Sequence, residues 1–250
     1  MIQPCAVLST YTPTGPNAEL FAQALSEHQP RLYITNSAIH NPTGAVLSPV
    51  TAHRVLKLAD QTGLTVIEDD IFADFENTPA ARLAAFDGLN RVVHIGSFSK
   101  TLSASVRCGF ITAPRAWIEG LVDLKIATAF GGCRLSSELV LSLLKNGSYR
   151  KHTESLRARL ARAMADTTAR LRVLGIEPWI RQPAGMFLWC RLPDGIDATD
   201  VTQRALAANV VLAPGNAFSL SQTASSYLRF NVAQCADERV FKVLNAAMRW

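Results

Sequence analysis

The sequence predicts an α/β fold, in which a parallel or mixed sheet carries helices on its faces, followed by a smaller α+β domain. From Cys5 to Ile111, short apolar runs of strand length alternate with runs of helix length, as is typical of such sheets. A long helical segment then begins at Ser148 and leads into a second set of short strands and helices. We therefore expect two domains, residues 1–147 and residues 148–250.

Local signals place the individual elements. Asn17 and Ser48 are suitable N-caps, and Pro49 suits the first position of the helix that Ser48 opens. The expected strands are 5–8, 31–35, 64–67, 91–95 and 108–111 in the first domain, and 176–180, 186–191, 210–212 and 226–232 in the second. The other expected helices are 18–28, 116–129, 136–144, 148 to about 174, 198–208 and 237–249, and 72–88 is expected to be an irregular connection.

Composition and charge exclude several classes of protein. The chain has 250 residues, of which 48% are hydrophobic and 18% charged, as expected for a globular protein with a sizeable core. The net charge of +5 is spread out, and its densest group follows Ser148, where no aromatic residues interleave; a solvated helix face is favoured over a nucleic-acid patch. The sequence shows no signal peptide and no apolar run long enough for a membrane span. A cytoplasmic location is therefore expected, where five scattered cysteines predict reduced thiols and no metal site.

The most informative stretch is Gly96-Ser97-Phe98-Ser99-Lys100-Thr101-Leu102, which follows the apolar strand 91–95. We expect Gly96 to let the chain turn sharply after this strand. Hydroxyl groups, a lysine and the nearby Arg107 at the carboxyl end of a buried strand suit a phosphorylated ligand. An amine with a lowered pKa at Lys100 could attack a carbonyl group. By itself, the stretch fits a surface lysine in a serine-rich loop equally well.

Two segments upstream carry further polar groups. The segment 36–44 begins where a strand ends, and Pro42 restricts Asn41 to extended conformations, although a plain turn is the alternative. Glu68-Asp69-Asp70 directly follow the strand 64–67. Three adjacent carboxylates there need a cationic partner, such as a protonated ring nitrogen or a metal, unless they cap a helix.

These groups are expected to meet, because ligands of such sheets bind beyond the carboxyl ends of the strands. Asn41, Asp69 and the run from Ser97 to Lys100 would then line one crevice. Arg229 lies in the otherwise apolar strand 226–232 and needs a carboxylate partner, either on a substrate or on an Asp or Glu of the chain.

The combination resembles a known family. His40-Asn41-Pro42-Thr43-Gly44, Glu68-Asp69-Asp70, Ser97-Phe98-Ser99-Lys100 with Arg107, and Arg229 together resemble the signature of the fold-type I pyridoxal-phosphate enzymes, the class I/II aminotransferases. The run from Ser97 to Gly109 is most similar to the aminotransferase-like domain of GntR/MocR-type transcription regulators. The resemblance implies the PLP-dependent transferase (aspartate aminotransferase-like) fold, with an incomplete large-domain sheet.

The resemblance implies pyridoxal 5′-phosphate as the cofactor and two catalytic residues. Lys100 would bind the cofactor as a Schiff base and then move the substrate proton, and Asp69 would pair with the protonated pyridine nitrogen. Asp69 is preferred to Asp70 because its place in the motif matches.

The other implied roles concern binding. Asn41 would donate a hydrogen bond to the ring's phenolic oxygen, next to the substrate. Ser97, Ser99 and Arg107 would hold the phosphate, and Arg229 would bind the α-carboxylate of an amino acid or 2-oxo acid. No metal is implied. By the same resemblance, the protein would be a homodimer.

Two departures from the family leave the function open. Ile71-Phe72 stand where the family commonly places a tyrosine that contacts the ring oxygen. The family's chains are also longer, and the expected missing part supplies strands, an aromatic residue on the ring and a phosphate-binding turn. The first hypothesis is an aminotransferase-type enzyme. The alternative is the effector-sensing domain of a GntR/MocR-type regulator, which would bind DNA only through an N-terminal domain absent from this sequence. A remnant that no longer binds the cofactor is a third alternative.

Overall fold

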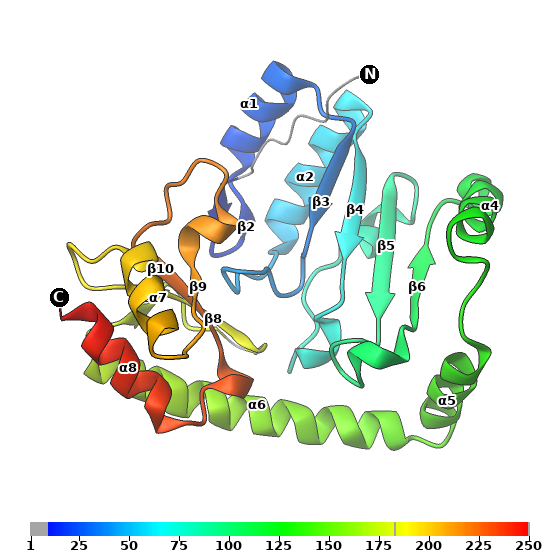
Figure 1. Ribbon diagram of the computed structural model, residues 1–250. Coiled ribbons are helices and arrows are strands. Elements are labelled where there is room, and N and C mark those ends of the chain that lie inside the picture. Colours follow the sequence, from blue (N-terminus) through cyan, green and yellow to red (C-terminus); the bar gives the residue numbers. More distant parts are fainter. Residues whose placement is uncertain (1–9, 183, 250) are drawn as a thin grey trace. The chain divides into compact units, whose positions relative to one another are not determined.

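The computed structural model describes residues 10–182 and 184–249, which form two compact units (Figure 1). The N-terminal unit contains residues 10–40 and 45–156. The C-terminal unit contains residues 41–44 and the described residues from 157 onward. This division falls inside helix α6 (Ser148–Val173), and the predicted domain boundary at 147/148 stays a prediction. The strand expected at 5–8 lies outside the described residues.

The N-terminal unit is built on a four-stranded mixed sheet. Its strands are, in spatial order, β3 (Leu32–Thr35), β4 (Thr65–Asp69), β5 (Val92–Ser97) and β6 (Gly109–Thr112). The first three are parallel and β6 is antiparallel to β5, as the α/β prediction allows. A small hairpin, β1 (Tyr11–Thr12) and β2 (Gly15–Pro16), precedes the sheet. The remaining elements are α1 (Ala18–His28), α2 (Pro49–Thr62), η1 (Ala73–Phe75), α3 (Leu83–Asp87), η2 (Ala104–Val106), η3 (Arg115–Trp117), α4 (Ile118–Ala129) and α5 (Arg134–Lys145).

Helices α1 and α2 begin where the capping signals predict. The Asn17 side chain accepts a hydrogen bond from the backbone N–H of Leu20 at 3.0 Å, and Ser48 Oγ accepts one from Thr51 at 3.1 Å. Both helices lie on one side of the sheet (Figure 1). Their buried residues pack with those of β4, β5 and α3 into one core, made of Phe21, Leu25, Leu47, Ala52, Val55, Ala59, Leu64, Val66, Leu83 and Val92. Burial of this apolar surface is what holds α1 and α2 on the sheet.

The prediction of an irregular connection over 72–88 is wrong, because η1 and α3 lie within it. No local capping signal in the sequence marks α3, because this helix is capped from a distant part of the chain. The backbone N–H groups of Leu83 and Ala84 donate to the Glu68 carboxylate at 2.8 and 2.9 Å. A helix of one turn needs such a tertiary cap to offset the cost of nucleation.

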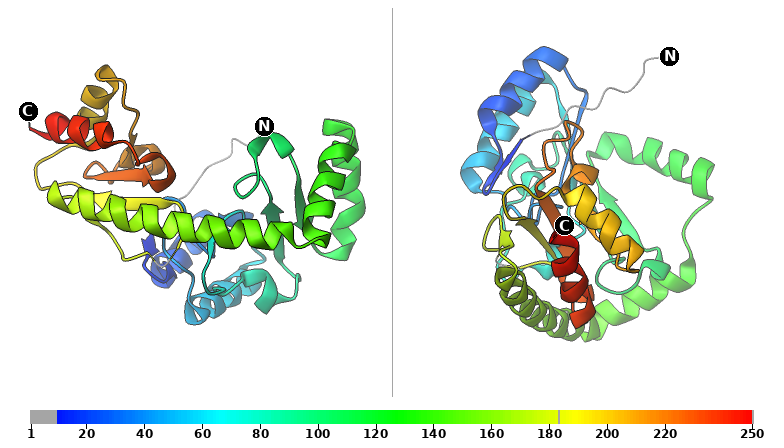
Figure 2. Two further views of the ribbon diagram at one scale, coloured as in Figure 1. Left: turned by 90° about the horizontal axis from the view of Figure 1, so that it is seen from below. Right: turned by 60° about the vertical axis from the view of Figure 1, so that its left-hand side comes forward.

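The C-terminal unit contains a four-stranded antiparallel sheet. Its spatial order is β7 (Glu177–Pro178), β8 (Phe187–Arg191), β10 (Tyr227–Asn231) and β9 (Ala213–Pro214). Its other elements are the later part of α6, α7 (Ala198–Ala207), η4 (Gly215–Phe218), η5 (Val232–Gln234) and α8 (Glu238–Met248). Helices α7 and α8 pack against each other (Figure 2).

The prediction of a strand at 210–212 is also wrong, since β9 starts at Ala213. The backbone N–H of Val210 instead donates to the Ala205 carbonyl at 2.9 Å, so Val210 closes the end of α7. Val211 is 83% exposed, which a buried strand would not allow. Within the part of the chain that the structure describes, no helix is long and apolar enough to cross a membrane.

The Glu68 cap can be tested by Glu68→Gln. The Gln amide nitrogen would face a backbone donor and leave it unpaired in a fully buried site, so the free energy of unfolding should fall by about 2–3 kcal/mol. Urea unfolding followed by circular dichroism measures this. The matched control is Glu27→Gln on the exposed face of α1, which should change stability by less than about 0.5 kcal/mol. Equal stability of the two variants would contradict the capping role.

Candidate active site

The three carboxylates at the end of β4 have different surroundings. The Glu68 side chain is fully buried and accepts hydrogen bonds from Ser37 Oγ and from the first amides of α3. For Glu68, the helix-cap alternative is therefore correct.

Asp70 is paired with cationic groups of the chain itself. Its Oδ2 lies 2.6 Å from Arg82 Nε and 3.1 Å from His94 Nε2. Arg82 also pairs with Glu76. The hydrogen bond to Asp70 raises the pKa of His94 above its usual value, although burial opposes this. Asp70 is therefore committed to a structural ion cluster and is a poor partner for a ligand.

Asp69 differs from both of its neighbours. Its Oδ1 accepts a hydrogen bond from the Ile71 backbone at 3.3 Å, and its carbonyl accepts one from Asn36 Nδ2 at 2.9 Å. Burial raises the pKa of the Asp69 carboxyl, and the nearby Lys100 ammonium opposes this rise. Among the described residues, Asp69 has no ion-pair partner within hydrogen-bonding reach. It is thus the carboxylate that remains available to a cationic group of a ligand.

The lysine loop follows β5 directly. Ser97 Oγ lies 3.0 Å from Ser99 Oγ and accepts a hydrogen bond from the Ser99 backbone at 3.1 Å. The Leu102 N–H donates to the Phe98 carbonyl at 2.8 Å, which closes the loop around Lys100. The Lys100 side chain is exposed and makes no hydrogen bond or ion pair with any described residue. The loop backbone is fixed, whereas the amine is free to bond to a ligand.

Gly96 has a different role from the one predicted. It lies inside β5 and does not make the turn. A Cβ atom at Gly96 would lie 2.2 Å from the Phe110 ring, so only glycine allows the close pairing of β5 with β6. This pairing aligns Ser97 with Gly109, two residues after Arg107.

Arg107 follows η2 with a left-handed backbone, φ 48°. The carbonyl of the next residue, Cys108, accepts a hydrogen bond from the Phe98 backbone at 3.1 Å. Two hydroxyl groups and a guanidinium group thus belong to segments that are bonded to each other at the end of β5. The site lacks any group of three or more metal-ligating side chains within the described part of the chain.

The C-terminal unit brings Asn41 and Arg229 together. Arg229 Nη1 donates to Asn41 Oδ1 at 2.9 Å. The guanidinium carbon lies 4.2 Å from the centre of the Phe187 ring and 4.5 Å from that of Phe218. Burial lowers the pKa of Arg229, and its Nε is buried without a hydrogen-bond partner. No carboxylate of the described residues pairs with Arg229, so its fork remains able to bind one from a ligand.

The segment 41–44 is held by this same unit. Gln182 Nε2 donates to the Thr43 carbonyl at 3.3 Å, and a Cβ atom at Gly44 would collide with the Gln182 side chain. Sequence reasoning missed Gln182, Phe187 and Phe218, because no motif marks them. The two phenylalanines could have been noticed as apolar residues near Arg229 only after the strands were paired. Because Asn41 belongs to one unit and Asp69 and Lys100 to the other, the common crevice stays a prediction.

Comparison with known proteins identifies the class and then the family. The fold is that of the fold-type I pyridoxal-phosphate aminotransferases. The α-aminoadipate aminotransferase LysN of Thermus thermophilus, solved with N-(5′-phosphopyridoxyl)-L-leucine, superposes with a TM-score of 0.85 at 27% identity over 95% of this chain and 63% of that one. Pyrococcus horikoshii kynurenine aminotransferase shows the same fold at 23% identity, with a TM-score of 0.85 over 95% of this chain and 61% of that one. The family described as "Aminotransferase class I and II" matches residues 10–246, and the chain belongs to it.

Curated relatives include both enzymes and regulators. The 2-aminoadipate transaminase of Thermus thermophilus is 31% identical over 90% of this chain and 58% of its own length. The uncharacterised HTH-type transcriptional regulator YdfD of Bacillus subtilis is 29% identical over 83% of this chain and 44% of its own length. The chain spans about half the length of the curated relatives it matches. The predicted fold, family and resemblance to GntR/MocR-type regulators are confirmed.

The family's cofactor, pyridoxal 5′-phosphate, is the one predicted, and the residues present fit it. A carboxylate without a cationic partner among the described residues ends β4, and an unpaired lysine follows the neighbouring strand β5. The hydroxyl groups of Ser97 and Ser99 lie beside that lysine in the loop. Such a set matches the charges of a pyridinium ring, an aldehyde and a phosphate group.

The Asp70–His94 pair predicts a pH-dependent stability. Because the pKa of His94 is raised in the folded state, its stabilising charge is fully present below the unfolded pKa of about 6.5 and is lost as pH rises through the folded value. His94→Gln, which keeps a neutral donor, should therefore lower the free energy of unfolding more at about pH 5.5 than at about pH 8.5. Urea unfolding at both pH values measures the difference. An equal loss at the two values would show that His94 is neutral when folded.

Proposed function

We propose that this chain binds pyridoxal 5′-phosphate and acts as part of an aminotransferase-type protein on an amino acid or 2-oxo acid. The observation that carries the proposal is the unpaired carboxylate of Asp69 beside the unpaired Lys100, at the ends of two adjacent parallel strands. Without a ligand, the half-buried Asp69 carboxylate has no directly hydrogen-bonded cation among the described residues.

The candidate site residues of the N-terminal unit have distinct proposed roles in binding the cofactor. When bound, the cofactor supplies an electron sink for bonds at the amino acid's Cα. Lys100 would hold the cofactor through the amine of its side chain, and the same amine would be the group that moves a proton. Asp69 would hold the protonated ring nitrogen, and this ion pair would offset the burial of its carboxylate. Ser97, Ser99 and Arg107 hold the phosphate.

The C-terminal unit supplies the substrate contact. Arg229 has a planar fork that contacts two aromatic rings, which suits the α-carboxylate of an amino acid. Asn41, whose Oδ1 accepts a hydrogen bond from Arg229, would have its amide nitrogen free to donate to the ring oxygen of the cofactor. The pairing of Asn41 with Arg229 supports a carboxylate-binding role for this pair within the C-terminal unit.

A second candidate is an effector-sensing domain of a GntR/MocR-type regulator. It is favoured by the regulators among the relatives and by Phe72, whose ring is 4% exposed and packs near Phe75, so that it offers no hydroxyl group to the cofactor. DNA binding would then reside outside these 250 residues. Mixing the cofactor-loaded chain with single amino acids separates the candidates: release of a 2-oxo acid supports the enzyme, and binding without release supports the sensor.

The proposal also covers the oligomeric state of the protein and its location in the cell. We propose a homodimer, which is supported by large apolar side chains exposed on α4 and α5, such as Leu124 at 62% and Leu135 at 79%. We also propose a cytoplasmic location, which is supported by the free thiols of the four cysteines that the structure describes.

The cofactor role of Lys100 is tested by Lys100→Ala. The purified chain should bind one equivalent of pyridoxal phosphate with a new absorption band, and borohydride should fix it on the peptide that contains Lys100. Lys100→Ala should abolish both signals, whereas Lys125→Ala, a change of an exposed lysine on α4, should preserve them. Fixation on other lysines at equal yield would refute the assignment.

The substrate role of Arg229 is tested by Arg229→Gln. Amino-acid binding by the cofactor-loaded chain should weaken by about 2–5 kcal/mol, because a carboxylate would lose its guanidinium partner, while cofactor affinity should change little. Spectral titration with amino acids measures both. Arg191→Gln, on the neighbouring strand β8, is the control and should affect neither. If Arg229→Gln weakened both equally, Arg229 would be structural.

A further inference from the structure

One tyrosine hydroxyl joins the two segments that carry Asp69 and Lys100. Tyr149, on the first turn of α6, donates to Asp74 Oδ2, and its hydroxyl lies 2.8 Å from Thr101 Oγ1. Asp74 lies in η1, five residues after Asp69, and Thr101 is the residue after Lys100. Tyr149 is only 8% exposed, so these hydrogen bonds are shielded from water.

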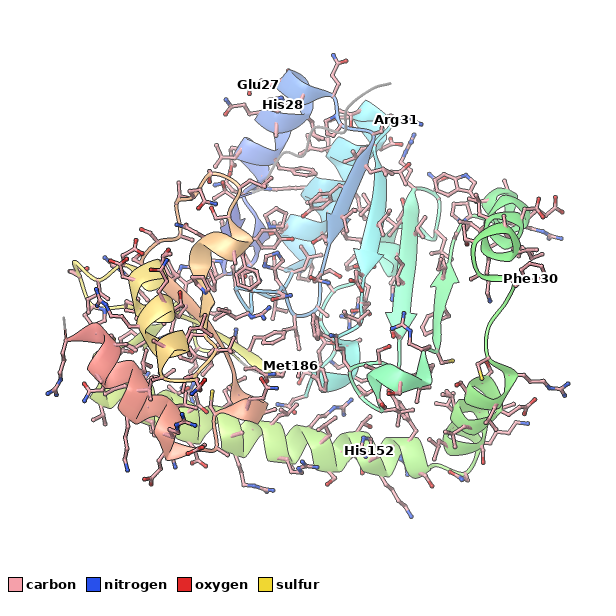
Figure 3. All side chains as sticks on the ribbon, viewed as in Figure 1. Glu27, His28, Arg31, Phe130, His152 and Met186 are labelled. Atoms are coloured by element: carbon pink, nitrogen blue, oxygen red, sulfur yellow. The ribbon has the colours of Figure 1, made fainter. Side chains whose placement is uncertain are left out.

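A second contact from the same helix holds the lysine loop by its backbone. His152 Nε2 lies 2.7 Å from the Thr101 carbonyl oxygen, and because a carbonyl only accepts, the ring nitrogen is the donor. Figure 3 shows His152 near the start of α6.

The Tyr149 ring adds a third contact. It packs edge-on against the Phe98 ring with centroids 5.5 Å apart. The loop is thus held on both sides of Lys100, at Phe98 and at Thr101, by two residues of one helical turn. The Lys100 side chain has no partner of its own among the described residues, so the position of its amine is set by the loop backbone.

We propose that Tyr149 and His152 are positioning residues for the cofactor site: they hold the Lys100 loop, and through Asp74 the segment after Asp69, at the separation that one pyridoxal ring requires. This rests on the proposed function. An amine and a carboxylate that bind opposite ends of one rigid ring must be placed beforehand, or binding spends free energy on ordering the two segments.

A comparison of Tyr149→Phe with Tyr227→Phe tests the role of the Tyr149 hydroxyl group. Tyr149→Phe keeps the ring contact with Phe98 and removes both hydrogen bonds. Tyr227 stacks on Trp189, and its hydroxyl has no hydrogen bond with a described residue, so Tyr227→Phe makes the same chemical change without this loss. Two readouts are taken: the pyridoxal-phosphate dissociation constant, from absorbance, and the backbone hydrogen exchange of residues 98–102 and 73–76 in the cofactor-free chain.

His152 is tested by a pair of variants. His152→Gln places an amide donor close to the position of Nε2, whereas His152→Ala removes the donor. Rescue of cofactor affinity and of slow exchange by Gln, but not by Ala, would identify the donated hydrogen bond as the cause. Circular dichroism and thermal unfolding show that every variant compared is folded.

We expect cofactor binding to weaken about tenfold in His152→Ala, which loses one buried hydrogen bond, and at least as much in Tyr149→Phe, which loses two. Hydrogen exchange should be faster in both segments for Tyr149→Phe. Wild-type affinity and exchange in Tyr149→Phe would overturn the inference. Faster exchange with unchanged affinity would also overturn it, because the contacts would then be structural only. If the wild-type chain binds no cofactor, the proposed function fails, and the exchange data alone still show whether Tyr149 joins the two segments.

Discussion

The arrangement of charge at the end of β4 depends on Arg82. This guanidinium pairs with Asp70 and with Glu76, and the two residues that follow it, Leu83 and Ala84, donate their amides to Glu68. One short segment thus compensates three carboxylates that would otherwise repel one another in a buried place. Asp69 is left as the one carboxylate of Glu68, Asp69 and Asp70 that makes no hydrogen-bonded ion pair or helix cap among the described residues. Its availability to a ligand is a consequence of the pairing of its neighbours.

In the lysine loop, the backbone is held in place whereas the Lys100 side chain is not. The β5–β6 pairing, the Ser97–Ser99 contacts and the first turn of α6 hold the backbone around Lys100. None of these contacts uses the amine. A rigid backbone with a free side chain suits the role proposed for Lys100, in which the amine changes its bonding partner and only the side chain has to move.

The aromatic rings of Phe187 and Phe218 lie against the guanidinium group of Arg229. Their centres lie 4.2 and 4.5 Å from the guanidinium carbon, and the rings cover part of its surface, which leaves its N–H groups for hydrogen bonds. Asn41 takes one donor of this edge, and the buried Nε still lacks a partner. A desolvated cation with unused donors binds a carboxylate more strongly than an exposed one, which is the property that recognition of an α-carboxylate requires.

The sequence by itself determined the α/β class, the starts of α1 and α2, the family and the residues of the motifs. These follow from local physics: N-caps, the period of apolar residues and short motifs are written within a few consecutive positions. It could not determine α3, which is capped by the distant Glu68, or the role of Gly96, which depends on Phe110 in the neighbouring strand. Only the tertiary structure decided which carboxylate is free and which residues hold Lys100 in place. Ion pairs such as Asp70–Arg82 and contacts such as Tyr149–Asp74 join residues far apart in the chain, and no local signal encodes their distance.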